Sequence, residues 1–154
     1  MKIGVGADPN GLTYQNEIID YLYNSGHDPI KYMCDTVCGE DYPDVAKKVG
    51  ESVLNGTIDR GILICGTGIG MAISANKVPG IRAACCHDIY SAERAQLSNN
   101  AQIITIGQQV IGIKPALRIV EEFLSHTFKD GRSTMKIEKI SKMEKAYLEK
   151  RARS

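Results

Sequence analysis

Residues 62–70 read Ile62-Leu63-Ile64-Cys65-Gly66-Thr67-Gly68-Ile69-Gly70. The apolar, β-branched start predicts a fully buried strand that ends at Cys65. A glycine-rich loop and a helical segment, residues 71–77, follow it. A strand, glycine loop and helix in this order direct several backbone N–H groups at one point, where oxyanions bind. A thiol beside such a loop can act as a base or nucleophile, so this stretch predicts a functional site.

Two other interpretations of this stretch are open. Cys65 could be a small buried core residue, which is how most free cysteines behave. The glycines could belong to a dinucleotide-binding fingerprint, since Asp88 follows about twenty residues later. The spacing is GxGxG, however, with Met71 where a third glycine is needed, and the loop follows the third predicted strand rather than the first. Nicotinamide and flavin binding are therefore disfavoured. The lack of a Lys-Ser or Lys-Thr pair after the glycines excludes a Walker-type loop.

Composition narrows the class of protein. A chain of 154 residues is long enough for one domain, residues 1–154, with a substantial core. Its net charge of +1 gives no reason to expect nucleic acid or a membrane surface as a partner. No apolar run approaches a membrane span, and Met1 leads into a strand rather than a signal peptide. The five cysteines form no CxxC pair. We expect reduced thiols in a cytoplasmic protein, and a zinc site at Cys34 and Cys38 is disfavoured.

Predicted strands and helices alternate along most of the chain. The strands are residues 2–7, 29–33, 62–65, 81–86 and 102–106, and the helices are 12–22, 43–54, 71–77, 87–97 and 115–123. This order predicts an α/β fold: a three-layer αβα sandwich around a Rossmann-like, five-stranded parallel sheet. Residues 134–151 predict an extended, charged C-terminal helix with an apolar stripe that includes Ile140 and Met143. We expect that helix to contact a partner subunit.

Ligands of an open parallel sheet bind outside the carboxyl ends of its strands. The residues predicted at those ends include Asp8 after the first strand, Cys65 after the third and His87 after the fourth. Although these residues are far apart in sequence, we expect them to share one crevice. Asp8 could also, or instead, cap the helix that follows it.

Several segments together resemble the sugar-phosphate isomerase family of ribose-5-phosphate isomerase B and the galactose-6-phosphate isomerase subunits. They are Asp41-Tyr42-Pro43, residues 59–70, residues 75–84, His87-Asp88 with Tyr90-Ser91-Ala92, and Gly131-Arg132. The resemblance spans nearly the whole chain. It implies aldose–ketose isomerisation of a phosphorylated sugar through a cis-enediolate, in a homodimer or homotetramer with active sites at the subunit interface. It implies neither a metal ion nor an organic cofactor, because peptide amides alone can stabilise an enediolate.

The resemblance also implies roles for individual residues. Cys65 would be the base that moves a proton between two sugar carbons, and Thr67 would help a proton pass between the oxygens. Asp8 would orient the sugar hydroxyls. The remaining substrate-binding positions are Gly66, Gly68, Ile69 and Gly70 in the loop, together with Ser98, Asn99, Gln109, Arg132 and Lys136. The last two would bind the phosphate, although either could instead be a solvated surface cation.

The chain departs from ribose-5-phosphate isomerase B at four of its functional positions. Pro9 and Ser98 stand where that enzyme has histidines, and the one at position 98 opens the furanose ring. Gln109 and Lys136 stand where arginines are usual, and lysine keeps the charge but loses bidentate geometry. Each change removes or weakens a proton-transfer or phosphate-binding group.

These departures favour a particular substrate. A 4-phosphorylated tetrose cannot close a furanose or pyranose ring, so its isomerase needs no ring-opening histidine. Residues 91–105 also resemble the branch of the family that serves erythritol breakdown. We therefore favour interconversion of D-erythrulose 4-phosphate and D-erythrose 4-phosphate. Ribose 5-phosphate isomerisation is the alternative, and a non-catalytic subunit of a hetero-oligomeric isomerase is disfavoured because Cys65 is retained.

Overall fold

The computed structural model describes residues 1–153, which contain one five-stranded parallel sheet. Its strands are β1 (Lys2–Ala7), β2 (Asp28–Met33), β3 (Arg60–Cys65), β4 (Ala83–Cys85) and β5 (Ile103–Gly107), in the spatial order β2-β1-β3-β5-β4. Every residue of β3 is buried, as expected for a central strand covered on both faces. The carboxyl ends of β1, β3 and β5 therefore lie side by side at one edge of the sheet.

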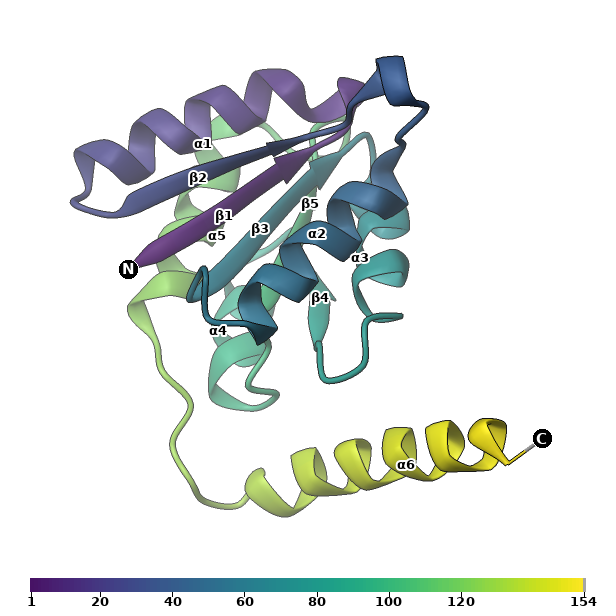
Figure 1. Ribbon diagram of the computed structural model, residues 1–154. Helices are drawn as coiled ribbons and strands as arrows, with labels where there is room; N and C mark the ends of the chain where they lie inside the picture. The colour runs from purple at the N-terminus through teal and green to yellow at the C-terminus, as the bar shows by residue number, and fades with distance from the viewer. Residues whose placement is uncertain (154) are drawn as a thin grey trace.

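Helices cover both faces of this sheet (Figure 1). They are α1 (Leu12–Asn24), α2 (Tyr42–Leu54), α3 (Ile69–Ala75), α4 (Ile89–Leu97), α5 (Ile113–Ser125) and α6 (Thr134–Ala152), with short 3-10 turns η1 (Pro9–Gly11) and η2 (Thr36–Cys38). One apolar cluster joins the sheet to α1, α4 and α5, and a second, smaller cluster joins it to α2 and α3. The predicted three-layer αβα sandwich is confirmed.

The predicted strands and helices are all present, with boundaries within two residues of the prediction, and two of the differences have a clear physical cause. The helix after the glycine loop begins at Ile69 rather than residue 71, because the left-handed backbone of Gly68 turns the chain into the helix there. The fourth strand spans three residues rather than 81–86. Arg82 lies outside it, where its side chain donates hydrogen bonds to the carbonyl oxygens of Asn99 and Asn100.

The C-terminal helix α6 lies below the sandwich in Figure 1, across the chain from the edge at which β1 and β3 end. None of its residues is buried. Its exposed apolar side chains include Met135, Ile140, Met143, Tyr147 and Leu148. One polar contact to the sandwich is a 2.8 Å hydrogen bond from the backbone N–H of Gly80 to the Glu144 carboxylate. The predicted extended C-terminal helix is thus confirmed. Among residues 1–153, no helix combines the length and apolar character needed to cross a membrane.

Candidate active site

The loop after β3 has a backbone that demands glycine at position 68. Gly68 has φ +78°, a left-handed conformation that side chains rarely adopt. A Cβ atom there would also lie 3.0 Å from the carbonyl carbon of Ile106 and 3.2 Å from Cys85 Sγ. This tight turn reverses the chain between Cys65 and α3, so that the loop folds back over the end of its own strand.

The Cys65 side chain is held against this loop. Its Sγ accepts the backbone N–H of Gly68 at 3.0 Å, and the residue is only 6% exposed. Burial beside Val45 and Met71 in the smaller apolar cluster is what a core cysteine would also show. The N–H directed at sulfur is the distinguishing feature, because it fixes the Sγ atom at the start of the glycine loop.

The end of β5 orients the loop by binding its carbonyl groups. The N–H groups of Gln108 and Gln109 donate to the oxygens of Cys65 and Gly66, each at 2.9 Å. The buried Thr105 hydroxyl donates to Gly68 O at 2.7 Å. A trans peptide places its C=O and N–H on opposite sides. The following amides, those of residues 66, 67 and 69, therefore point away from β5. That of Ile69 donates to the Thr67 hydroxyl oxygen at 3.3 Å, which leaves those of residues 66 and 67 for an oxyanion.

Asp8 lies beside Cys65 at the neighbouring strand end. Ala7 pairs with Ile64 in the sheet, and the N–H of Asp8 donates to Ile64 O at 3.3 Å. The Asp8 carboxylate accepts the N–H of Asn10 at 2.9 Å, so the capping interpretation is confirmed for the turn η1. The same residue is 6% exposed and lines a cavity of about 180 Å³ with Met33 and Cys34. The structure therefore leaves a hollow in front of a carboxylate that is already fixed in position.

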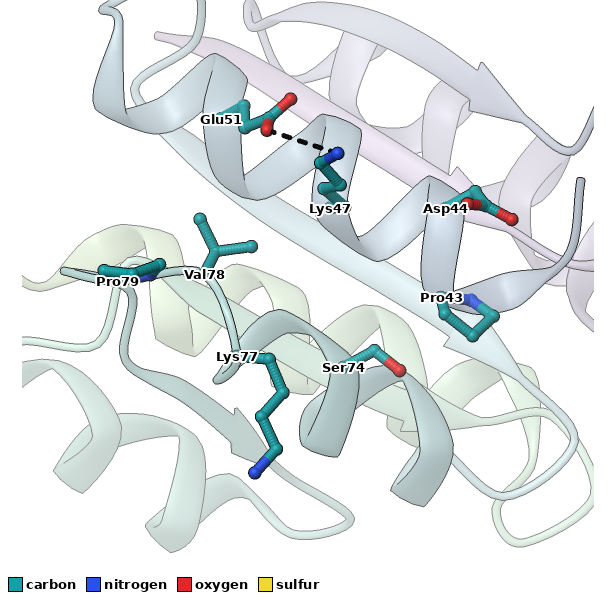
Figure 2. A pocket seen from close by; sticks show the side chains of 8 residues that line it. All are labelled: Pro43, Asp44, Lys47, Glu51, Ser74, Lys77, Val78 and Pro79. Atoms are coloured by element: carbon teal, nitrogen blue, oxygen red, sulfur yellow. Dashed lines mark ion pairs between the residues drawn. The ribbon is translucent and has the colours of Figure 1, made fainter. Parts of the chain in front are cut away.

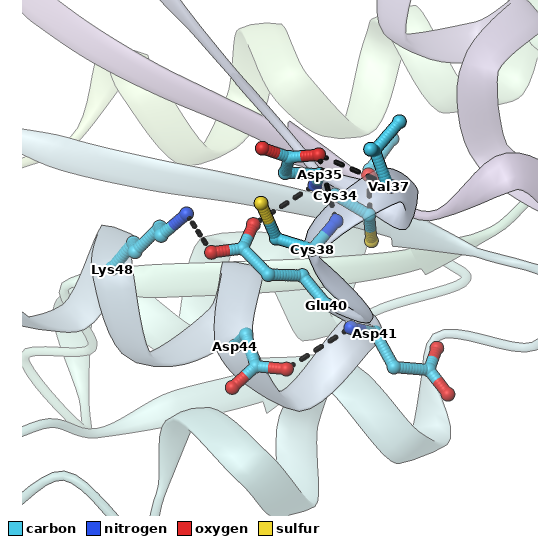
Figure 3. A network of polar contacts seen from close by, with 9 residues as sticks. Cys34, Asp35, Val37, Cys38, Glu40, Asp41, Asp44 and Lys48 are labelled. Atoms are coloured by element: carbon cyan, nitrogen blue, oxygen red, sulfur yellow. Dashed lines mark hydrogen bonds and ion pairs between the residues drawn. The ribbon is translucent and has the colours of Figure 1, made fainter.

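The segment between β2 and α2 borders this cavity and is held in place by hydrogen bonds among its own residues and by an ion pair to α2 (Figure 3). The Asp35 carboxylate accepts N–H groups from Val37 and Cys38, and Glu40 accepts one from Asp35 and pairs with Lys48 at 2.5 Å. Burial, followed by the carboxylates of Asp41 and Asp8, raises the pKa of Cys34. That thiol is thereby kept protonated at neutral pH. Within residues 1–153, no three His, Cys, Asp or Glu side chains are arranged to hold a metal ion.

Tyr42 is a site residue to which the sequence analysis assigned no role. It begins α2, where Asp41 and Asp44 form a reciprocal capping box. A Cβ atom at Gly70 would lie 2.8 Å from Tyr42 Cε2 and 3.0 Å from Cζ, so the ring packs directly on the loop. The Asp41-Tyr42-Pro43 segment was the available signal. Thr105 was missed as well, although a hydroxyl within the apolar run of β5 marks it.

The remaining predicted residues divide into two groups. Gln109 lies at the loop, with its carboxamide 3.2–3.4 Å from where a Cβ of Gly66 would be. Ser98 and Asn99 follow α4, and Asn99 is bound by Arg82 just before β4, at the opposite edge of the sheet. Arg132 and Lys136 lie where α6 begins, exposed and also away from the loop (Figure 1). One chain thus brings together Asp8, residues 65–70 and Gln109, but not the other four.

Comparison with known proteins places this geometry in a family. The sequence model described as Ribose/Galactose Isomerase matches residues 3–140. The chain belongs to this family. It is 49% identical over 142 residues to D-erythrulose-4-phosphate isomerase of Pectobacterium atrosepticum, covering 91% of this chain and 93% of that protein. It is 36% identical over 143 residues to ribose-5-phosphate isomerase B of Escherichia coli, covering 93% and 96%.

Solved structures of the ribose/galactose isomerase family have the same fold. Ribose-5-phosphate isomerase B of Clostridium thermocellum superposes with a TM-score of 0.90 at 44% identity, covering 96% of this chain and 99% of that one. The predicted family, the α/β fold and the isomerase class are confirmed by these matches.

A larger surface groove lies apart from the residues that the family resemblance selects. It has a volume of about 360 Å³ and lies between α2, α3 and the segment after α3 (Figure 2). Its lining includes Lys47, Glu51 and Lys77, and the first two pair with each other at 3.9 Å. None of the predicted site residues lines this groove, whereas Asn99 lines a still larger hollow of about 400 Å³ together with Arg82 and with Ile140 of α6.

Proposed function

We propose that this ribose/galactose isomerase interconverts D-erythrulose 4-phosphate and D-erythrose 4-phosphate. The observation that carries the choice of substrate is Ser98, a residue that cannot replace a ring-opening histidine. A tetrose blocked at O4 stays open-chain and needs no such group. Similarity to a D-erythrulose-4-phosphate isomerase at 49% identity supports the same choice.

The proposed chemistry follows from the loop geometry. The Cys65 thiolate removes the proton from C2 of the aldose, or from C1 of the ketose, and negative charge develops on the carbonyl oxygen. The N–H groups of residues 66 and 67 face that oxygen and stabilise the cis-enediolate. The Thr67 hydroxyl passes a proton between O1 and O2. Cys65 then returns its proton to the neighbouring carbon, so that no electron leaves or enters the pair of carbons.

An activity panel tests the substrate. Erythrose 4-phosphate, ribose 5-phosphate, allose 6-phosphate and galactose 6-phosphate are each compared by kcat/KM. We expect the tetrose to be preferred, and we expect Ser98→His to raise turnover of ribose 5-phosphate while leaving that of the tetrose nearly unchanged. Preference of the unmodified chain for ribose 5-phosphate would instead support the alternative substrate, the one in the name of the 44% identical ribose-5-phosphate isomerase B of Clostridium thermocellum.

We propose further that the active site is completed by a second copy of the chain. The proposal is supported by the separation of the two groups of predicted residues. The start of α6, which contains Lys136 and lies two residues after Arg132, is across the molecule from the carboxyl end of β3, where Cys65 lies (Figure 1). It is also supported by the exposed apolar side chains of α6, among them Met143 and Leu148. Two-fold symmetric assembly would cover such a face and deliver the start of one subunit's α6 to the loop of the other.

Mixing two inactive variants tests the shared site. Cys65→Ala and Arg132→Ala each remove one half of it, and a mixed dimer retains one intact site of two. Subunits exchanged at equal amounts should regain about one quarter of the wild-type activity, since half of the dimers are mixed. Failure to regain activity, with subunit exchange shown by mass spectrometry, would place both halves in one chain.

All five cysteines are unpaired thiols in the described structure, which supports a reducing, cytoplasmic location.

A further inference from the structure

His87 has no part in the proton transfers described above, yet it binds the frame of the active-site loop. Its Nε2 atom accepts the backbone N–H of Gly107 at 2.9 Å. Gly107 is the buried last residue of β5 and pairs directly with Cys65 in the sheet. The imidazole therefore lies one residue pair away from the proposed base.

This hydrogen bond requires one form of the imidazole. A backbone N–H can only donate, so Nε2 must carry a lone pair and the ring proton must be on Nδ1. An imidazolium, with a proton on both nitrogens, could not accept this bond. What His87 supplies is an acceptor at the Nε2 position.

Gly107 in turn contacts the loop that holds the reacting groups. A Cβ atom at Gly107 would lie 2.6 Å from the carbonyl carbon of Thr67 and 2.7 Å from its oxygen, so the two backbones touch. The next two residues, Gln108 and Gln109, donate their N–H groups to the oxygens of Cys65 and Gly66. The loop therefore packs on the end of β5 and the two residues after it, and His87 holds the end of β5 in position.

We infer that His87 is a positioning residue for the isomerisation. By holding Gly107, it sets the place of the Thr67 hydroxyl and of the amides that face the enediolate. It touches neither substrate nor reacting atoms. The inference rests on the proposed function only in that the reaction proceeds at Cys65. Because the loop amides act on the charge that develops during the reaction, the loss of His87 lowers kcat rather than raising KM.

A pair of substitutions separates the acceptor from the bulk of the ring. His87→Leu removes the acceptor, whereas His87→Gln places Oε1 near the position of Nε2. We expect His87→Leu to lower kcat by about 100-fold, the scale of a small misplacement of catalytic groups. We expect its KM to stay within about threefold of wild type and His87→Gln to recover most of kcat. His126→Leu, at the far end of α5, is the matched control and should leave both constants unchanged.

Two further measurements do not depend on turnover. The rate at which iodoacetamide alkylates Cys65 is followed by peptide mass spectrometry across pH. We expect this rate to differ from that of wild type in His87→Leu and to match that of wild type in His87→Gln. Nitrogen NMR of the wild-type chain should show the His87 proton on Nδ1. An Nε2–H tautomer, a full kcat in His87→Leu, or equal losses in the leucine and glutamine variants would overturn the inference. A wild-type chain inactive on every sugar phosphate would refute the proposed function, and alkylation and NMR would still decide the role of His87.

Discussion

The aromatic ring of Tyr42 packs on Gly70 so closely that no side chain fits between them. A methyl group at Gly70 would lie 2.8–3.0 Å from two ring carbons, well inside ordinary contact distance. The first residue of α2 thereby limits which side chains the first turn of α3 can carry. It does so from 28 positions earlier in the sequence.

The first prediction concerns this contact. Gly70→Ala should destabilise the fold by about 1–3 kcal/mol, because overpacking forces the ring or the loop to move. In a Tyr42→Ala background the same change should be neutral or stabilising by up to about 1 kcal/mol, since alanine favours a helix. Urea unfolding of the four proteins in this double-mutant cycle measures the coupling. Equal costs in both backgrounds would show that the ring does not limit the loop.

The second prediction concerns the base. Cys65→Ala and Cys65→Ser should each lower turnover by about 10²- to 10⁴-fold, the range for removing a general base. Their circular dichroism and melting temperatures should stay close to wild type. Cys38→Ala, at an exposed thiol on η2, is the control and should retain full activity. Undiminished isomerisation by Cys65→Ala would show that Cys65 is a core residue without a catalytic role.

The third prediction concerns acid stability. Asp88 caps α4, and hydrogen bonds from the Ser91 hydroxyl and the Ser91 N–H lower the pKa of its carboxyl. A lowered folded-state pKa means that the stabilisation is fully present above the ordinary aspartate pKa. It is lost as the pH falls below about 4 and through the folded-state value.

Asp88→Asn keeps a capping side chain but has no charge to lose. Wild type should therefore be more stable than Asp88→Asn at pH 7, and the difference should shrink as the pH falls from 5 to 3. Urea unfolding at a series of pH values measures it. Asp20→Asn, at an exposed position on α1, is the control for a general charge effect. A pH-independent difference between wild type and Asp88→Asn would contradict the assignment.

The fourth prediction concerns thiol reactivity. Burial, more than the neighbouring Cys85 and Asp88, raises the pKa of Cys86 to about 12, and its side chain is 1% exposed. Iodoacetamide at pH 8 should therefore label Cys38 in the folded protein and leave Cys86 unlabelled until denaturant is added. Peptide mass spectrometry reads both sites in one sample. Early labelling of Cys86 in the folded protein would show that β4 opens readily.

Local patterns in the sequence were sufficient for the fold and for the placement of Asp8 and Cys65 at neighbouring strand ends. The apolar run before Cys65 could only be a buried strand, and alternation of strands and helices led to a parallel sheet. The rule that strand ends meet then put Asp8 beside Cys65. His87 is at that edge too, but its imidazole is bound to Gly107 instead of facing a shared crevice.

Contacts between distant segments could not be predicted in the same way. The Tyr42 ring on Gly70 and the Thr105 hydroxyl on Gly68 each depend on how two elements pack, and periodicity carries no such information. The length of β4 depends on the Arg82 side chain, whose acceptors lie 17 and 18 residues further along. The separation of Arg132 from Cys65 likewise became visible only when the chain was placed in space.

Because the carbonyl groups of Cys65, Gly66 and Gly68 are bound by Thr105 of β5 and by the two residues that follow β5, the proposed proton-transfer groups belong to the centre of the sheet. The groups expected to recognise the length and phosphate of the sugar, Ser98, Arg132 and Lys136, belong to peripheral segments. Under the proposed function, substitutions in these outer segments would change which sugar is accepted while the proton-transfer groups stay in place.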